Sequence, residues 1–277
     1  MTVAVEQSTV DIAGVATAVI DTGETGGGLP PVLLLHGSGP GVSAAANWRA
    51  VIPALRTGRR VIAPDQLGFG GTATGEPRTF GREAWTGHAL AVLDALGVAQ
   101  VDVIGNSMGG AIALSMAVAR PSAVRRLVLM GTMGVAMPLP AGLDTVWGYT
   151  PGVEAMREVI GLFAYDHGLI NDDLVRMRYE ASLHPPVRDS WAAMFPAPRQ
   201  RWVDDLALSG SQLAAVRQPV LMVHGRDDRV VPWRSSSAPL VDLLPDCRLH
   251  VIGGCGHWTM IEKTAEFLAV VEPFLSV

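Results

Sequence analysis

The stretch Gly105-Asn106-Ser107-Met108-Gly109 decides how the chain folds. It follows Val101-Asp102-Val103-Ile104, whose β-branched residues predict a short strand. It precedes an Ala-rich run, residues 110–119, that predicts a buried helix ending before Pro121. A G-x-S-x-G pattern between a strand and a helix is the setting of a nucleophile elbow, where the serine occupies a strained turn. We therefore predict that Ser107 is a catalytic nucleophile.

The composition predicts a well-buried globular protein without a nucleic-acid partner. Of 277 residues, 49% are hydrophobic and 17% are charged, and the net charge of −5 provides no basic surface for nucleic acid. The two cysteines, Cys247 and Cys255, have neither CxxC nor metal-ligand spacing, which predicts reduced thiols and no metal site. No secretory signal and no apolar run of ~18–20 residues is recognised, so we expect a cytoplasmic protein without a membrane partner.

Strand-like and helix-like segments alternate along the chain. Strands are expected at residues 16–21, 31–35, 60–64, 101–104, 127–130, 219–225 and 248–252, and helices at 47–55, 87–96 and 264–275. This alternation predicts an α/β fold with a doubly wound, mostly parallel sheet and helices on both faces.

The alternation stops in residues 134–204, which hold seven prolines and no convincing buried strand. Helical pieces are still expected there. Asn171 resembles an N-cap before acidic first-turn residues, and Pro185-Pro186 is expected to end that helix. We therefore predict one α/β core, residues 1–133 and 205–277, with residues 134–204 inserted between core strands as a helical lid.

A serine nucleophile needs a base, and the base needs an orienting acid. In folds with this elbow the chain order is serine, then an acid, then histidine. Asp228 follows the strand expected at 219–225, and His257 lies on a Gly-rich loop after the strand expected at 248–252. The carboxyl ends of the strands are where open α/β sheets bind ligands. We therefore predict the triad Ser107, Asp228 and His257.

Other acids and histidines compete for these roles. The chemistry of the side chains hardly decides whether Asp227 or Asp228 is the triad acid. We favour Asp228 and expect Asp227 to be solvated or paired with an arginine. His224 and His250 lie inside expected strands, which is typical of core or edge histidines. His36 ends the 31–35 strand and is expected to shape the next turn rather than to transfer protons.

An oxyanion needs two preorganised N–H donors. The elbow predicts that Met108, directly after the nucleophile, supplies one from its backbone. The loop His36-Gly37-Ser38-Gly39-Pro40-Gly41 is expected to supply the other from Ser38. This loop lacks the patterns of phosphate and dinucleotide sites, which argues against a nucleotide cofactor.

These motifs together resemble those of the meta-cleavage-product (carbon–carbon bond) hydrolases of the α/β-hydrolase superfamily. The resemblance lies in His36-Gly-Ser-Gly-Pro-Gly-Val-Ser-Ala-Ala-Ala-Asn47-Trp48-Arg49, in the elbow, and in Gly256-His257-Trp258. Arg178-Tyr-Glu-Ala-Ser182 and the stretch from Met194 to Asp204 are similar to the lid of the branch that acts on 2-hydroxymuconate semialdehyde. The similarity runs from about residue 30 to the C-terminus and implies the α/β-hydrolase fold.

The resemblance also implies a reaction. The family pattern G-x-x-D-x-x-V-P fits residues 225–232 and places the triad acid at Asp228. The implied activity is serine-dependent hydrolysis of the C5–C6 bond of 2-hydroxy-6-oxohexa-2,4-dienoate-type products of aromatic ring cleavage. The implied partners are this small anionic dienoate and further copies of the chain in a homo-oligomer. No metal or organic cofactor is implied.

The resemblance implies a polar set around the substrate. It consists of Asn47, Asn106, Arg178 and Trp258. A protein of net negative charge needs a local cation to bind an anion, and arginine binds a carboxylate through two hydrogen bonds. Each residue also has a structural alternative: a helix cap for Asn47, a turn-stabilising amide for Asn106, a solvated lid face for Arg178, and apolar wall packing for Trp258.

Two other functions are compatible with the residues. The same triad serves carboxylesterases, which cleave a C–O bond. The fold also serves non-catalytic ligand-binding proteins, although an intact set of Ser107, Asp228 and His257 argues against that alternative.

Overall fold

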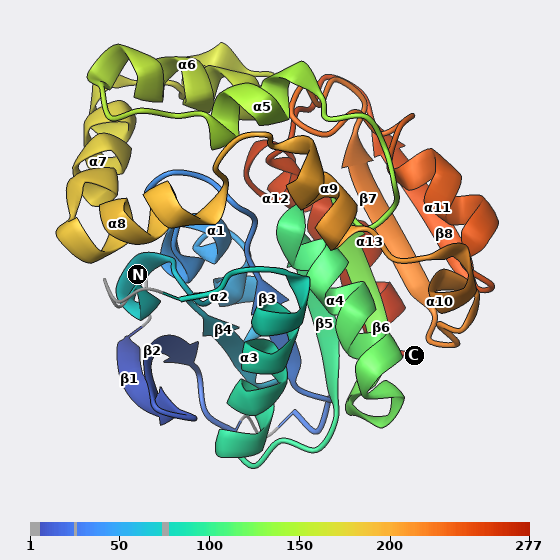
Figure 1. Cartoon of the computed structure of the whole chain (residues 1–277). Helices are drawn as coiled ribbons and strands as arrows, with labels where there is room; N and C mark the ends of the chain where they lie inside the picture. The colour runs from blue at the N-terminus through green and yellow to red at the C-terminus, as the bar shows by residue number, and fades with distance from the viewer. Residues whose placement is uncertain (1–5, 25–26, 74–77) are drawn as a thin grey trace.

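The sheet has eight strands, and the chain winds it mostly in parallel (Figure 1). The structure is a computed structural model and describes residues 6–24, 27–73 and 78–277. The strands are β1 (Gln7–Ile12), β2 (Val15–Asp21), β3 (Val32–Leu35), β4 (Val61–Pro64), β5 (Val101–Asn106), β6 (Val124–Met130), β7 (Val220–Gly225) and β8 (Cys247–Ile252). Their order is β1-β2-β4-β3-β5-β6-β7-β8; β1–β2 and β2–β4 are antiparallel and the remaining pairs are parallel. The predicted α/β sheet is confirmed.

Helices cover this sheet and continue beyond its end. The core helices are α1 (Ala44–Trp48), α2 (Ile52–Leu55), α3 (Arg82–Ala95), α4 (Met108–Ala119), α10 (Gly210–Ala214), α11 (Ser237–Leu243), α12 (Thr259–Glu262) and α13 (Thr264–Leu275), with 3₁₀ turns at Gly70–Thr72 and Pro121–Ala123. Figure 1 shows α3 and α4 in front of the sheet and α13 behind it. Every residue of β3, β4, β5 and β7 is buried, as expected of strands covered on both faces.

Five of the helices between β6 and β7 lie beyond the end of the sheet, with α5 and α6 across the top of Figure 1. They are α5 (Ala141–Trp147), α6 (Val153–Phe163), α7 (Asp172–Leu183), α8 (Pro185–Met194) and α9 (Gln200–Leu206), with a 3₁₀ turn at His167–Leu169. Asn171 is the N-cap of α7, as predicted, because its side chain accepts the N–H of Leu174 at 2.8 Å. Helix α9 continues across residue 204, where the sequence placed the end of the lid.

One local prediction was wrong because of proline, and a second prediction at proline was right but incomplete. The helix expected at 47–55 is two short helices, since Pro53 in the first turn of α2 has no N–H and cannot continue a preceding helix. Pro185-Pro186 follows the end of α7 but also begins α8, where the fixed φ of proline suits the first helical turn. Strand β1 was not predicted at all. Its residues are mostly exposed, so it lacks the apolar alternation that marks a buried strand.

Candidate active site

The elbow holds Ser107 in a strained conformation between β5 and α4. Its φ of 55° and ψ of −117° lie where non-glycine residues pay roughly 1–3 kcal/mol. Backbone bonds hold the turn: the N–H of Ser107 donates to Met130 O at 2.8 Å, and its carbonyl accepts from Gly110 and Met133. A side chain at Gly105 would collide with the backbone of α4, since its Cβ would lie 2.4 Å from Gly109 O. The small flanking residues are therefore required for the close approach of strand and helix.

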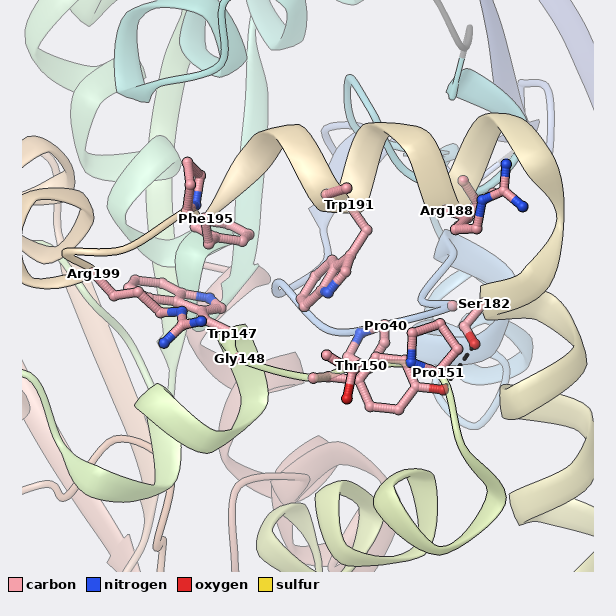
Figure 2. A pocket seen from close by; sticks show the side chains of 15 residues that line it. Pro40, Trp147, Gly148, Thr150, Pro151, Ser182, Arg188, Trp191, Phe195 and Arg199 are labelled. Atoms are coloured by element: carbon pink, nitrogen blue, oxygen red, sulfur yellow. Dashed lines mark hydrogen bonds between the residues drawn. The ribbon is translucent and has the colours of Figure 1, made fainter.

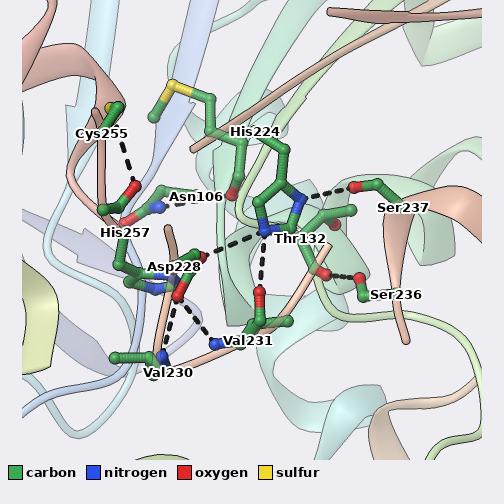
Figure 3. Close-up of polar contacts among 12 residues, drawn as sticks. Asn106, Thr132, His224, Asp228, Val230, Val231, Ser236, Ser237, Cys255 and His257 are labelled. Carbon is green, nitrogen blue, oxygen red and sulfur yellow. Dashed lines mark hydrogen bonds and ion pairs between the residues drawn. The ribbon is translucent and has the colours of Figure 1, made fainter. Parts of the chain in front are cut away.

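Asp228 lies in the loop after β7 with both carboxylate oxygens bonded (Figure 3). Its Oδ1 accepts the backbone N–H groups of Val230 and Val231 at 2.8 and 2.9 Å. Its Oδ2 accepts from His257 Nδ1 at 2.6 Å and from His224 Nε2 at 3.1 Å. Burial opposes ionisation, but the charge of His257 and the donors from the two histidines hold the pKa of Asp228 well below its usual range.

His257 is oriented by its ring and by its backbone. Because a carboxylate only accepts, Nδ1 carries the proton that faces Asp228, and Nε2 remains able to take a proton. The backbone N–H of His257 donates to Phe163 O at 2.8 Å, and the Phe163 ring stacks on the imidazole at a centroid distance of 5.5 Å. The end of lid helix α6 thus packs directly on the histidine.

The neighbouring carboxylate faces elsewhere. Asp227 Oδ2 accepts the N–H of Gly254 at 2.8 Å, and its side chain lies beside the guanidinium of Arg226. Its side chain is 29% exposed, compared with 0% for Asp228. The geometry therefore distinguishes the two aspartates, which the residue types alone did not. Asp227 has the arginine partner that we expected.

His224 has a role that sequence reasoning missed. We expected an ordinary core histidine; it is fully buried, but it also bonds Asp228 directly (Figure 3). The sequence feature that could have indicated this contact is the position of His224 near the end of a strand, four residues before the predicted acid. His250 is the edge histidine that we expected, 3.3 Å from Glu266.

The two expected oxyanion donors are the backbone N–H groups of Met108, at the start of α4, and of Ser38, in the loop after β3. Met108 is the first residue of α4, so its N–H has no partner within the helix. In the described part of the chain, no acceptor is found for the backbone N–H of Ser38, while the Ser38 hydroxyl accepts from Trp147 Nε1 at 2.9 Å.

The loop that carries Ser38 is held by His36, which is fully buried. The imidazole Nε2 accepts the N–H of Gln66 at 2.9 Å, so Nδ1 carries the hydrogen and donates to Gly37 O at 2.8 Å. Burial, assisted by the charge of Arg178, lowers the pKa of His36. A neutral histidine therefore shapes this turn, as the sequence predicted.

Three of the four expected substrate-binding residues line one cavity of about 100 Å³, next to the lid. These are Asn47, Arg178 and Trp258. Arg178 is only 6% exposed, yet no ion pair with it is found among residues 6–24, 27–73 and 78–277. Its Nε and the Nδ2 of Asn47 are buried without a hydrogen-bond partner. Burial, and to a lesser degree the charge of Arg49, lowers the pKa of Arg178 to about 10, so it is charged at neutral pH.

The structural alternatives for these residues can now be compared with the geometry. The N-cap of α1 is Ser43 and not Asn47, and Arg178 is not on a solvated face. Trp258 stacks on Phe163 at a centroid distance of 5.1 Å, so it packs as well as lining the cavity. Asn106 does not line this cavity; it donates to Met130 O at 3.3 Å, as a turn-stabilising amide does.

A larger cavity of about 250 Å³ lies within the lid and above the Ser38 loop (Figure 2). Its walls include the aromatic side chains of Trp147, Trp191 and Phe195, with Arg188 and Arg199 at its two ends. Among the described residues, neither this cavity nor the Arg178 cavity is lined by Ser107, Asp228 or His257. Trp147, which bonds the Ser38 hydroxyl, connects the two regions.

The part of the chain that the structure describes holds neither a metal-binding cluster nor a membrane-spanning helix. No group of three or more His, Cys, Asp or Glu side chains is arranged to hold a metal ion. No helix combines the length and apolar character that crossing a membrane requires.

Known proteins are similar to this chain over nearly its whole length. The family model of the alpha/beta hydrolase fold matches residues 30–264. The 2-hydroxymuconate semialdehyde hydrolase of Pseudomonas sp. (strain CF600) is 49% identical, covering 95% of this chain and 92% of the relative. The 2-hydroxy-6-oxo-2,4-heptadienoate hydrolase of Pseudomonas putida (strain F1) is 51% identical, covering 89% of both chains.

A solved structure agrees with the sequence relatives. The meta-cleavage product hydrolase CumD of Pseudomonas fluorescens IP01, a serine-to-alanine mutant complexed with acetates, is 45% identical and superimposes with a TM-score of 0.92, covering 96% of both chains. The chain therefore belongs to the α/β-hydrolase fold family and, within it, to the meta-cleavage product hydrolases, enzymes that hydrolyse carbon–carbon bonds.

Proposed function

We propose that this enzyme cleaves the C5–C6 bond of 2-hydroxy-6-oxohexa-2,4-dienoates, namely 2-hydroxymuconate semialdehyde and its 6-alkyl analogues, in aromatic catabolism. The observation that carries the proposal is the buried guanidinium of Arg178, which has no anionic partner within the described chain. A buried charge without a partner is strongly unfavourable, so a bound anion is the natural partner. The substrates named for the two sequence relatives support a dienoate.

The carboxylate of the substrate would lie in the cavity of Arg178 and Asn47. The guanidinium can donate two parallel hydrogen bonds to a carboxylate, and the unpaired amide of Asn47 can donate another. A Cβ on Gly39 would lie 3.6 Å from Arg178 Nη2, so the guanidinium reaches the loop that also carries Ser38. This places the anion site beside the proposed oxyanion donors.

The triad of Ser107, Asp228 and His257 would then perform the chemistry. Family resemblance implies that the bound dienol first takes the keto form, with a proton placed on C5. Ser107 Oγ then adds to the C6 carbonyl while His257 Nε2 takes its proton. The N–H groups of Ser38 and Met108 stabilise the resulting oxyanion.

Collapse of this adduct breaks the C5–C6 bond. The electron pair is delocalised into the α-keto acid portion, and the resulting dienolate takes the proton held by His257 and leaves as 2-hydroxypenta-2,4-dienoate. The C6 acyl group remains on Ser107 until water, deprotonated by His257, releases a small carboxylic acid. The protein supplies an acid–base pair, an oxyanion site and a cation, and the proposal requires no cofactor.

Residues 134–204 are proposed to act as a lid over this site. The family resemblance favours a homo-oligomer, and the sequence, in which no secretory signal was recognised, favours a cytoplasmic location. Packing of Phe163 on His257 supports the lid assignment, because it joins the inserted helices to the proposed base. Light scattering of the purified protein would give the mass and test the oligomer directly.

The test presents the yellow ring-cleavage product of catechol to the purified enzyme. We expect the dienol absorbance to disappear with the wild type but not with Ser107→Ala, and Ser115→Ala on the same buried helix is the control that should stay active. Efficient turnover of a p-nitrophenyl ester with an untouched dienoate would replace the proposal with a carboxylesterase.

A further inference from the structure

His224 connects two parts of the chain around the proposed triad acid. It is the last residue but one of β7, it is 0% exposed, and each ring nitrogen has a partner. Nε2 lies 3.1 Å from Asp228 Oδ2 and 2.8 Å from Val231 O, while Nδ1 lies 2.7 Å from the hydroxyl of Ser237 on α11. Figure 3 shows the imidazole between these groups, on the side of Asp228 that His257 does not occupy.

The partners determine where the hydrogen on this ring lies. A carboxylate and a backbone carbonyl only accept hydrogen bonds, so Nε2 must carry the N–H that points between Asp228 and Val231. In the neutral imidazole, Nδ1 then accepts the hydroxyl hydrogen of Ser237. The donor toward Asp228 is therefore defined by its surroundings.

We propose that His224 is a positioning residue for the proton transfer. Its Nε2–H holds Asp228 in the orientation that serves His257, and it weakens the attraction of Asp228 for the imidazolium proton of His257. This inference rests on the triad of the proposed function. Both histidines bond the same oxygen, Oδ2, so the donor from His224 takes up part of the negative charge that His257 faces. A carboxylate without that donor would hold the imidazolium proton more tightly and return it less readily to the leaving group.

The charged and titratable groups around Asp228 are few. His224 approaches from β7 and His257 from the loop after β8. Burial, followed by the charges of Glu262 and then Asp228, raises the pKa of the nearby Cys255 thiol to about 12, so this thiol is uncharged at neutral pH. The two histidines are thus the groups that set the proton affinity of the carboxylate.

The experiment compares His224→Met with His224→Gln. The two side chains have the same length, but only glutamine places an N–H donor near the position of Nε2. For His224→Met we expect kcat to fall by about 10- to 100-fold, the range for a charged group that loses one hydrogen bond. KM should change little, because the cavity of Arg178 is separate. The acid limb of the pH profile of kcat/KM should move to higher pH, and His224→Gln should restore both quantities.

Two controls separate this role from folding and from the triad itself. His88→Met makes the same change in a buried histidine bonded to Thr17, and it should lower the melting temperature without moving kcat or the acid limb. Asp228→Asn tests the triad. If that variant stays active, the triad assignment fails and the role of His224 fails with it.

Other results overturn the inference alone. One is an Asp228→Asn variant that is inactive while His224→Met keeps its activity. Another is an equal loss of kcat in His224→Met and His224→Gln. The third is the same shift of the acid limb in His88→Met. If His224→Met does not fold, His224→Gln still decides. A folded glutamine variant with the wild-type acid limb supports the proposal, and a shifted limb contradicts it.

Discussion

Asp228 and Arg178 are both buried charges in the proposed active site, and they differ in how many partners the described chain gives them. Asp228 is 5% exposed and accepts hydrogen bonds from Val230, Val231, His224 and His257. Arg178 is 6% exposed, and neither an ion pair nor a partner for its Nε is found in the described chain. Its neighbour in the cavity, Asn47, also has an unpaired amide.

This difference distinguishes a side chain that bonds other groups of the protein from a side chain that is left to bind the ligand. The carboxylate proposed to orient a histidine in every catalytic cycle is held by bonds that do not depend on substrate. A cation that must recognise an anion is left without an internal competitor, at the cost of burying an unpaired charge. Orphaned buried donors therefore indicate where a ligand supplies the missing acceptor.

Replacing Asp228, the buried charge with several hydrogen-bond partners, should have the largest effect on activity. Asp228→Asn replaces one acceptor oxygen by an NH₂ group, which opposes a donor on either side. We expect kcat to fall by about 10³- to 10⁴-fold, as for other triad acids, with ligand affinity nearly unchanged. The free energy of unfolding should also fall. The matched control is Asp227→Asn, and a comparable loss in that variant would contradict the assignment.

Removing the unpaired cation should affect activity and stability in opposite directions. For Arg178→Met we expect kcat/KM to fall by about 10²- to 10³-fold, because a charged bond to the carboxylate is lost. We expect the free energy of unfolding to rise by roughly 1–3 kcal/mol, because an unpaired buried charge is removed. Arg176→Met, an exposed position on the same helix, should change neither. A less stable Arg178→Met would show that Arg178 has an internal partner.

The affinity for anions should depend on pH through Arg178. Its pKa is lowered to about 10, mainly by burial, and only the charged guanidinium attracts a carboxylate. The dissociation constant of sorbate, whose carboxylate stays ionised, should be flat at neutral pH. It should rise as the pH passes about 10, by about tenfold per pH unit. Calorimetric titrations measure this, and an equal rise in Arg178→Met would assign the pH dependence to another group.

The smallest effect is expected from the unpaired amide. Asn47→Ala should lower kcat/KM by about tenfold or less, the loss of one hydrogen bond, with little change in melting temperature. Asn171→Ala removes an amide that caps α7, so it should lower the stability by about 1 kcal/mol without changing the kinetics. If Asn47→Ala instead lowers the stability and leaves kcat/KM intact, Asn47 belongs with the structural amides.

Prediction from the sequence succeeded where local residues decide the backbone. The elbow, the N-cap at Asn171 and the C-terminal helix at Thr264–Leu275 lie where the sequence placed them. It failed at β1, whose exposed residues gain their conformation from pairing with β2, and at Pro53, which divides a pattern that has helical spacing.

The sequence by itself determined the elbow around Ser107 and the chain order of the triad candidates, because steric limits at glycine and the alternation of strands act over a few residues. Only the tertiary structure decided that Asp228 rather than Asp227 faces His257, and that His224 shares the same carboxylate oxygen. It also decided that Arg178 is buried, with neither an ion pair nor a partner for its Nε among the residues that the structure describes. These contacts join loops from different strands and the lid, and their distances depend on the order of the sheet and on how the inserted helices pack over it.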